Sequence, residues 1–347
     1  MSDFLFFDST LRDGSHAIAH QYSAENIETY CRGADDVGFH TIIVGHGNGL
    51  GASSLQVGLS ALSDEEMLST AKKHLKKTKL GVFLIPGFGT IHDNLSPAFE
   101  LGIDLVCVGT HCTEADVTSQ HIEYVRSRDK DAYGVLMMYH MTTTEKLLEE
   151  ALKMQSYGAM GVILMDSAGA STPEMVSEKV KALVDKLDIR VGFHAHNNLG
   201  LAVSNSYTAI QMGATLIDGT IRGFGAGAGN CQLEVLAGLL RKMKYNTGLD
   251  LYKMMDVSED IVSKIMKKPQ EITSMALISG LSGVFSAFTT HVQNAAERFG
   301  VDPRDIFIEL GNRKIIAGQE DFIVDVAMNI AQKNKKDDVS YQIESLL

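Results

Sequence analysis

Short, continuously apolar runs recur along the first 220 residues, and longer segments with apolar residues every three or four positions separate them. Uninterrupted apolar runs are typical of parallel strands that are covered on both faces by helices. We therefore expect an α/β fold. The eight runs lie near residues 4–8, 41–45, 80–85, 105–109, 132–138, 161–165, 190–195 and 215–220.

The intervening segments carry helix signals at both ends. In one of them, Val176, Val180 and Leu183 are spaced as on one helix face, with Thr172 as the expected N-cap and Pro173 at the first helical position. A glycine ends several other segments, because it adopts the left-handed conformation that stops a helix. Eight strand–helix units of this kind predict a (β/α)8 TIM barrel. The glycines are Gly38, Gly102, Gly158 and Gly213.

The strand pattern stops near residue 245, and only helical periodicity follows. Candidate helices cover residues 252–266, 279–299 and 303–310. We therefore predict a TIM barrel over residues 1–250, which is expected to be the catalytic domain, and a C-terminal helical domain over residues 251–347.

Charge and composition restrict the possible partners. The chain of 347 residues has 31 basic and 43 acidic side chains, a net charge of −12, and no basic block. Nucleic acids and anionic membranes are therefore excluded as expected partners. The N-terminus lacks a signal-peptide pattern, no apolar stretch reaches the ~18 residues of a membrane span, and the four cysteines show no C-x-x-C spacing. We expect free thiols and a cytoplasmic protein.

Polar residues at the ends of the expected strands indicate a metal site. Asp13 follows the first run, and His194 and His196 end the seventh. Because residues i and i+2 of a strand point to the same face, both imidazoles can bind one ion at the C-terminal end of a barrel. This donor set suits Mn²⁺ or Mg²⁺ and also accepts Zn²⁺ or Fe²⁺. The alternative is that the histidine pair is simply two polar residues at a strand end.

Two residues beside Asp13 are candidates for catalysis. Arg12 can hold a carboxylate through two hydrogen bonds, and the alternative is a salt bridge at the barrel rim. His16 titrates in the range needed to move a proton near neutrality, and His20 lies farther from the strand end. Other polar residues at strand ends are each as well explained by a structural role. They are His46, His111 and His140.

A glycine-rich loop, residues 223–230, follows the eighth expected strand, where many barrels bind phosphate. It lacks the Lys-Ser/Thr ending of a P-loop, and close packing against the sheet explains it equally well. Asn230 is expected to cap the helix that begins near Leu233.

Six motifs between about residues 5 and 330 resemble, in order, those of the 4-hydroxy-2-oxovalerate aldolases. This family belongs to the metal-dependent lyase superfamily that includes hydroxymethylglutaryl-CoA lyase and isopropylmalate synthase. The motifs are TLRDGSHAI from Thr10, GHGNGLG from Gly45, HCTEADV from His111, HAHNNL from His194, GAGAGN from Gly225 and GQED from Gly318.

The resemblance implies a pyruvate-specific class II aldolase, a carbon–carbon lyase. Such an enzyme reversibly cleaves 4-hydroxy-2-oxopentanoate or a related 4-hydroxy-2-oxoacid to pyruvate and a short aldehyde, here with a place in aromatic-hydrocarbon catabolism. It uses Mn²⁺, or Mg²⁺ or Co²⁺, and no organic cofactor. The resemblance also implies an oligomer and pairing with an acylating aldehyde dehydrogenase that receives the aldehyde, and the C-terminal domain over residues 251–347 is the expected region of contact with this partner.

The resemblance also assigns roles to residues. Asp13, His194 and His196 bind the metal, Arg12 steadies the pyruvate enolate and binds substrate, and His16 is the base for the C4 hydroxyl. Ser167 matches a contact to the substrate carboxylate. Five positions depart from the family pattern, and one of them, Phe285, is also a candidate substrate-binding residue. Phe285 replaces a tyrosine, Phe83 and Ile85 replace leucines, and Asn48 and Asn197 replace an aspartate and a histidine.

Three alternatives remain at the level of sequence. An acyl-CoA lyase or Claisen-type synthase would share the metal ligands. A metal hydrolase of amidohydrolase type fits less well, because its H-x-H pair normally belongs to the first strand and not the seventh. A non-catalytic barrel that scaffolds a partner is the third, and Phe285 in place of tyrosine is the feature that keeps it open.

Overall fold

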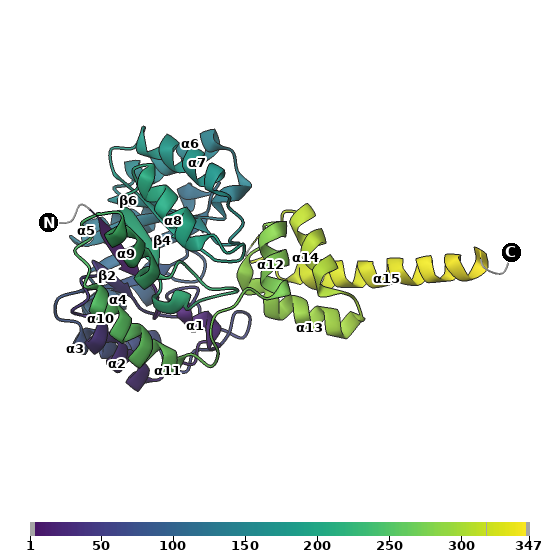
Figure 1. The fold of residues 1–347 in the computed structure, drawn as a ribbon, viewed down its shortest axis with the longest axis horizontal. Helices are drawn as coiled ribbons and strands as arrows, with labels where there is room; N and C mark the ends of the chain where they lie inside the picture. The colour runs from purple at the N-terminus through teal and green to yellow at the C-terminus, as the bar shows by residue number, and fades with distance from the viewer. Residues whose placement is uncertain (1–3, 317, 345–347) are drawn as a thin grey trace.

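The computed structural model describes residues 4–316 and 318–344, and these contain a closed barrel of eight parallel strands in sequence order (Figure 1). Each apolar run forms one strand, so the predicted TIM barrel is confirmed. The strands are β1 (Leu5–Asp8), β2 (Thr41–Ile43), β3 (Lys79–Leu84), β4 (Leu105–His111), β5 (Asp131–Met137), β6 (Gly161–Asp166), β7 (Arg190–Ala195) and β8 (Leu216–Gly219).

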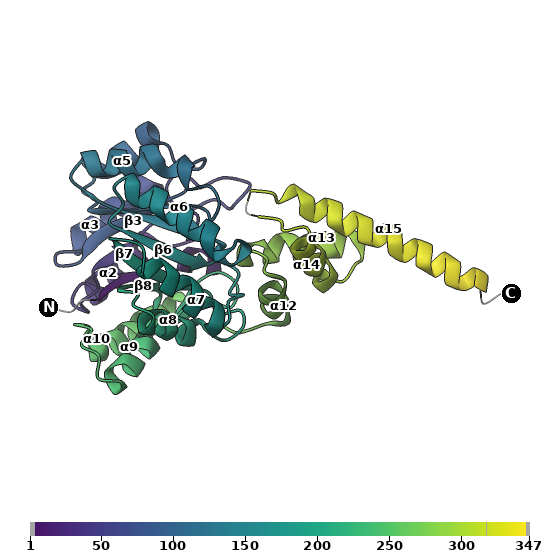
Figure 2. The same cartoon turned by 90° about the horizontal axis from the view of Figure 1, so that it is seen from above.

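Helices cover the outside of this barrel (Figures 1 and 2). The Thr172 side chain accepts a hydrogen bond from the Met175 amide and Pro173 is the first helical residue, as the sequence predicts. These helices are α2 (Ala24–Ala34), α3 (Asp64–His74), α4 (Ser96–Glu100), α5 (Ser119–Ser127), α6 (Thr144–Ser156), α7 (Pro173–Val184), α8 (Ala202–Gln211) and α9 (Leu233–Lys242). The short helix α1 (Gly14–Ala17) lies instead in the connection after β1.

Large side chains fill the interior of the barrel. The rings of Phe7 on β1 and Tyr133 on β5, strands on opposite sides of the barrel, lie 5.0 Å apart between centroids. Both belong to a buried apolar cluster that also contains Phe83 and Met165. The interior is therefore a packed core, which leaves the ends of the strands as the place for a site.

The chain from Leu251 to Ile265 remains attached to the barrel. It forms α10 (Leu251–Asp256), the π-helical turn η5 (Val257–Val262) and α11 (Ser263–Ile265). Met254, Val257 and Val262 are buried in the same apolar cluster as the barrel helices. The apolar core of the barrel therefore continues beyond residue 250. The domain boundary at this residue stays a prediction.

Four further helices enclose a separate apolar cluster that includes Val284, Phe307 and Val326. The last of these helices extends away from the rest of the molecule (Figures 1 and 2). They are α12 (Ser274–Ser282), α13 (Thr289–Phe299), α14 (Pro303–Asn312) and α15 (Asp321–Glu344). Within the described residues, no helix is both long and apolar enough to cross a membrane.

The single helix expected over residues 279–299 is wrong, because the chain is interrupted in the middle. Gly283 takes a left-handed conformation with φ +65° and ends α12. A short 3-10 turn, η6 (Ser286–Phe288), then leads into α13. A left-handed glycine stops a helix, whereas helical periodicity alone continues through it. The interruption carries Phe285, one of the candidate site residues.

Candidate active site

Asp13, His194 and His196 meet at one end of the barrel. Asp13 lies in the turn after β1, His194 on β7 and His196 directly after it. All three are buried, and one possible ligand atom from each lies within 4.8 Å of the others. The Nε2 atom of His194 and the Nδ1 atom of His196 have no hydrogen-bond partner among the described residues. Buried polar atoms are normally paired, so the three side chains fit a divalent cation.

Asp218 fixes the orientation of His194. The two residues are aligned on the adjacent strands β7 and β8, and the Asp218 carboxylate lies 2.8 Å from Nδ1 of His194. The hydroxyl of Ser9 donates to the other carboxylate oxygen at 2.7 Å. A carboxylate in this place keeps the proton on Nδ1 and leaves the lone pair of Nε2 for a metal. Sequence reasoning missed Asp218, although its position near the end of the eighth strand was a usable signal.

The Asp13 carboxylate is held ionised by its surroundings. Burial by itself would raise its pKa, but the charge of Arg12, with smaller contributions from nearby histidines, holds the pKa well below its usual range. One oxygen lies 2.6 Å from Nη1 of Arg12. The other accepts hydrogen bonds from the Ala226 amide at 3.0 Å and from the Asn230 side-chain amide at 2.9 Å. A charged carboxylate is the form that binds a metal.

The role expected for Asn230 is therefore wrong. The cap residue of α9 is Gln232, which makes no side-chain capping bond, while Asn230 bonds the candidate ligand Asp13 instead. The glycine-rich loop explains how this contact is possible. A Cβ atom on Gly225 would collide with both the Asp13 carboxylate and the Asn230 amide. Close packing against the site thus accounts for glycine at this position.

Arg12 reaches over the same end of the barrel. It is 3% exposed, and its guanidinium carbon lies 4.9 Å from the centroid of the Phe83 ring. Beyond Asp13 its nitrogens have only longer contacts, such as 3.4 Å to the Gly47 carbonyl, and Nε is buried without a partner among the described residues. The guanidinium therefore has donors left for an anionic ligand.

A small cavity of about 20 Å³ lies against these groups. Its walls combine the polar residues with apolar side chains from the interior of the barrel. They include Arg12, Asp13, His16, Asn48, Phe83, Ile85, Met137, Met165, His196 and Phe285. No lysine is among the described residues that line it. We call it the inner cavity.

His16 borders the inner cavity from α1. Burial, with only part of its effect opposed by the charge of Asp13, lowers the pKa of His16 to about 4. The imidazole is therefore neutral at pH 7 and able to accept a proton. Its ring lies 5.0 Å from the ring of His20, which in turn stacks on His46 at 3.7 Å. His20 and His46 do not line the inner cavity.

The three histidines at other strand ends make local hydrogen bonds. His46 donates to the Gly58 carbonyl at 3.1 Å and accepts from the Asn48 amide at 3.0 Å. His111 bonds the Thr113 hydroxyl, and His140 bonds the Gly283 carbonyl at the end of α12. None of the three lines the inner cavity, so the structure supports a local structural role for each.

Ser167 and Phe285 differ in their access to the site. Ser167, directly after β6, is buried, and its oxygen accepts a hydrogen bond from the Met138 amide at 3.2 Å. It does not line the inner cavity. Phe285 lines this cavity, and its backbone region is tied to the barrel because the Ser286 amide donates to the Ser167 carbonyl at 3.4 Å.

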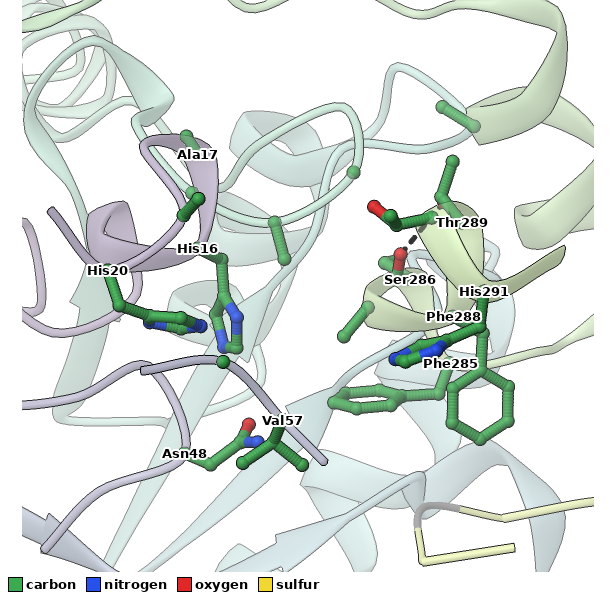
Figure 3. Close-up of a pocket in the computed structure, with 18 of the residues that line it drawn as sticks. His16, Ala17, His20, Asn48, Val57, Phe285, Ser286, Phe288, Thr289 and His291 are labelled. Carbon is green, nitrogen blue, oxygen red and sulfur yellow. Dashed lines mark hydrogen bonds between the residues drawn. The ribbon is translucent and has the colours of Figure 1, made fainter. Parts of the chain in front are cut away.

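A larger chamber of about 550 Å³ lies outside the inner cavity, between the barrel and the C-terminal helices. The two share His16, Asn48, Ala226 and Phe285 in their walls. Figure 3 shows His16, His20 and Asn48 on one side of this outer chamber, and Phe285, Ser286 and His291 on the other. A molecule in the inner cavity therefore has room to extend toward α13.

Comparison with known proteins identifies the family. Residues 3–261 match the HMGL-like family model. The chain belongs to the HMGL-like family. Residues 270–332 match a DmpG-like communication domain. A 4-hydroxy-2-oxovalerate aldolase of Pectobacterium atrosepticum is 51% identical over 331 residues, which are 95% of this chain and 96% of that protein. The aldolase of the same name from Carboxydothermus hydrogenoformans is 50% identical over 329 residues, 95% and 98% of the two chains.

Solved structures extend the likeness in fold. The carboxyl transferase domain of Rhizobium etli pyruvate carboxylase superposes with a TM-score of 0.79 at 15% identity, over 95% of this chain and 60% of that one. At this identity the likeness concerns the fold alone. The relatives at about half identity, together with the HMGL-like match, confirm the resemblance to the aldolase family.

Proposed function

We propose that this HMGL-like protein is a metal-dependent aldolase that reversibly cleaves a 4-hydroxy-2-oxoacid, such as 4-hydroxy-2-oxopentanoate, to pyruvate and a short aldehyde. The observation that carries the proposal is the buried group of Asp13, His194 and His196, with two unpaired imidazole nitrogens, beside Arg12 and His16. The names of the relatives support the same reaction.

The reaction needs a group that accepts negative charge on the pyruvate half. Breaking the C3–C4 bond leaves an electron pair that is delocalised onto the C2 oxygen as an enolate, which takes a proton at C3 from solvent to become pyruvate. Asp13, His194 and His196 would hold a divalent ion, which would supply Lewis-acid stabilisation of that oxygen. Arg12 lies on the same cavity with unused donors, so it stabilises the developing charge from a second side. A lysine-based Schiff base has no support, since none of the described residues around the inner cavity is a lysine.

His16 takes the proton of the C4 hydroxyl. This proton must leave as the C4 carbon becomes the aldehyde carbonyl. His16 is the neutral imidazole on the inner cavity that does not belong to the metal group, and burial keeps its pKa near 4. It is therefore a base at neutral pH. In the reverse direction the protonated imidazole returns the proton to the aldehyde oxygen.

Two further assignments concern substrate placement. Among the described residues, the Ser167 side chain makes one hydrogen bond, as the acceptor from the Met138 amide, so its hydroxyl proton has no acceptor in that set. Phe285 borders the site of C4 with an apolar ring and offers no hydroxyl to the C4 oxygen. We propose that Ser167 binds the carboxylate and that Phe285 limits the space around C4.

We propose Mn²⁺ as the working ion, with Mg²⁺ and Co²⁺ as substitutes. One carboxylate with two imidazoles is a mixed oxygen and nitrogen donor set that these ions accept. The chemistry described above needs no organic cofactor.

The C-terminal helices suggest a protein partner. Their match to a communication domain supports pairing with an acylating aldehyde dehydrogenase that takes up the aldehyde. We propose that the contact surface lies within the predicted C-terminal domain, residues 251–347, on the helices from α12 onward, because their apolar cluster is separate from that of the barrel. Oligomeric assembly and a cytoplasmic location stay predictions.

Pyruvate release from racemic 4-hydroxy-2-oxopentanoate tests the proposed function. We expect release with Mn²⁺ and its loss with EDTA, restored by added Mn²⁺. Turnover of an acyl-CoA in place of the hydroxy-oxoacid would select the acyl-CoA lyases and synthases instead. Tight Mn²⁺ binding without turnover of either class would favour the non-catalytic barrel.

A further inference from the structure

The outer chamber receives the aldehyde half of the substrate, if the proposed function holds. With the oxoacid end at the metal group, C4 lies beside His16, and whatever C4 carries projects away from the metal. His16 borders both cavities, and the outer chamber begins on its far side. The side chains of the outer chamber therefore decide which aldehydes fit.

Hydrogen-bonding side chains line part of the outer chamber, beside apolar ones. Asn48 stands at the junction of the two cavities, and Thr290, His291 and Gln293 of α13 form part of the outer wall. Figure 3 shows Asn48 and His291 on the two sides of the chamber, with Phe285 on the side of His291. Pockets for small apolar ligands are instead lined mainly by apolar side chains.

Several of these polar side chains have no hydrogen-bond partner in the part of the chain that the structure describes. Among the residues that the structure describes, the side chains of Asn48, Thr290 and His291 make no hydrogen bond or ion pair. Other polar side chains of the same wall are already engaged. The Thr289 hydroxyl donates to the Ser286 carbonyl at 2.9 Å, for example. The unengaged groups remain available to a ligand.

Asn48 is the decisive position, because it is half-buried and touches both cavities. Its amide offers both a donor and an acceptor to a group attached directly to C4. An alkyl group there would displace water that is hydrogen-bonded to the Asn48 amide and would form no hydrogen bond in its place, which disfavours binding. A hydroxyl group would form hydrogen bonds to the amide instead.

We propose that the outer chamber selects hydroxylated aldehydes, so that the substrates are 4-hydroxy-2-oxoacids with a further hydroxyl on C5, such as 4,5-dihydroxy-2-oxopentanoate. Asn48 bonds the C5 hydroxyl, and Thr290 and His291 meet hydroxyls farther along the chain. The bond changes stay those of the aldolase. In the addition direction, pyruvate loses a C3 proton to solvent to give the enolate. C3 then forms a bond to the aldehyde carbon as the carbonyl π bond breaks, and the aldehyde oxygen takes the proton from His16.

The test compares two aldehydes of matched size, glycolaldehyde and propanal, as acceptors for pyruvate in the presence of Mn²⁺. They differ by a hydroxyl in place of a methyl group. We expect kcat/KM, per concentration of unhydrated aldehyde, to favour glycolaldehyde by about tenfold or more. Asn48→Leu keeps the volume and removes the amide, and it should lower this preference about tenfold.

Variants of α13 probe the outer part of the chamber. Thr290→Val and His291→Phe should lower kcat/KM for glyceraldehyde relative to glycolaldehyde. Both residues are exposed, so these variants are expected to fold even if Asn48→Leu does not. Thr208→Val is the matched control, because Thr208 lies on α8 with its hydroxyl bonded to the Ser204 carbonyl. It should leave the preference unchanged.

The outcomes separate the two proposals. A wild-type preference for propanal that Asn48→Leu does not change would overturn the selection of hydroxylated aldehydes while leaving the aldolase intact. Failure of every aldehyde, together with no pyruvate release from 4-hydroxy-2-oxopentanoate, would overturn the proposed function itself.

Discussion

The barrel end and the C-terminal helices are built in contrasting ways. Around the metal group, buried charged side chains are tied to one another, as in the chain from Ser9 through Asp218 to His194. The C-terminal helices enclose a small apolar cluster and leave large apolar side chains exposed, with Leu281 65% and Ile308 46% exposed. The first arrangement fixes atoms for chemistry, whereas the second leaves a surface suited to a partner.

The two regions meet at the outer chamber. The amide of Asn198 donates to the Ala276 carbonyl at 3.0 Å, and Gln56 donates to the Glu320 carboxylate at 3.3 Å. The barrel thus supplies the reacting groups, and the helices supply one wall of the space beside them. Changes at the barrel end should abolish chemistry, and changes in the helices should alter stability or selectivity.

The largest effect is expected at the metal group. Asp13→Ala and His194→Ala each remove one of three ligands, so Mn²⁺ binding and pyruvate release should disappear together, with activity falling at least about a thousandfold. Metal content of the purified protein and pyruvate release check this. Undiminished cleavage by the Asp13 variant would refute the metal assignment.

His16→Ala should separate binding from chemistry. The variant keeps all three proposed ligands, so Mn²⁺ and pyruvate binding should persist while kcat for cleavage falls by about 10² to 10⁴. Calorimetric titration with pyruvate and steady-state kinetics measure the two properties. Equal loss of pyruvate affinity would show that His16 supports the site and not the proton transfer.

Asp218→Asn tests whether the orientation of His194 affects metal binding when all three proposed ligands are still present. Loss of the charge beside Nδ1 of His194 should weaken Mn²⁺ binding by about 10-fold to 100-fold. Activity should recover at saturating Mn²⁺, since the three ligands are still present. Activity that stays low when the metal is saturating would assign Asp218 a more direct part in the reaction.

Phe307→Ala should act on the other region alone. Phe307 is fully buried in the C-terminal cluster, and its truncation should lower the free energy of unfolding of this region by about 3–5 kcal/mol. Mn²⁺ affinity should not change. Phe322, which is 44% exposed, provides the control, because Phe322→Ala should cost no more than about 0.5 kcal/mol. Loss of metal binding in Phe307→Ala would mean that the two regions unfold as one.

The smallest effect is expected at the start of α14. Asp302 accepts a hydrogen bond from the Arg304 amide at 2.9 Å, and bonds to Arg304 lower its pKa from 3.8 to about 2. Asp302→Asn should cost about 0.5 kcal/mol, since asparagine also caps helices. Because the pKa of Asp302 is lower in the folded than in the unfolded state, its charge stabilises the folded state above pH 3.8, and this stabilisation is lost as the pH falls toward 2. The thermal unfolding temperatures of the wild-type protein and of Asp302→Asn should therefore converge over this pH range. A difference between the two temperatures that stays constant down to pH 2 would contradict the prediction.

Much of the fold could be predicted because its signals are local. Every apolar run became a strand, and Thr172 with Pro173 marked the start of a helix. The meeting of the candidate metal ligands was also predictable, because strand ends in a barrel converge whatever their distance in sequence. Asp13 and His194 are 181 positions apart and still meet.

The remainder depended on contacts that sequence does not display. Asn230 has the residue type and position of a helix cap, but tertiary packing turns its amide to Asp13. Gly283 lies within a helical pattern, and only the backbone conformation shows the stop. Asp218 lies near the end of a strand, where functional residues of a barrel are expected. Its pairing with His194, however, depends on the register between β7 and β8, which the sequence pattern does not give.

The most direct test of the metal site titrates metal-free protein with Mn²⁺ and records bound ion and pyruvate release in the same sample. If Asp13, His194 and His196 bind the ion, activity rises in proportion to bound Mn²⁺ and levels off at one ion per chain, with neither signal in His194→Ala. Full pyruvate release from metal-free protein would contradict it.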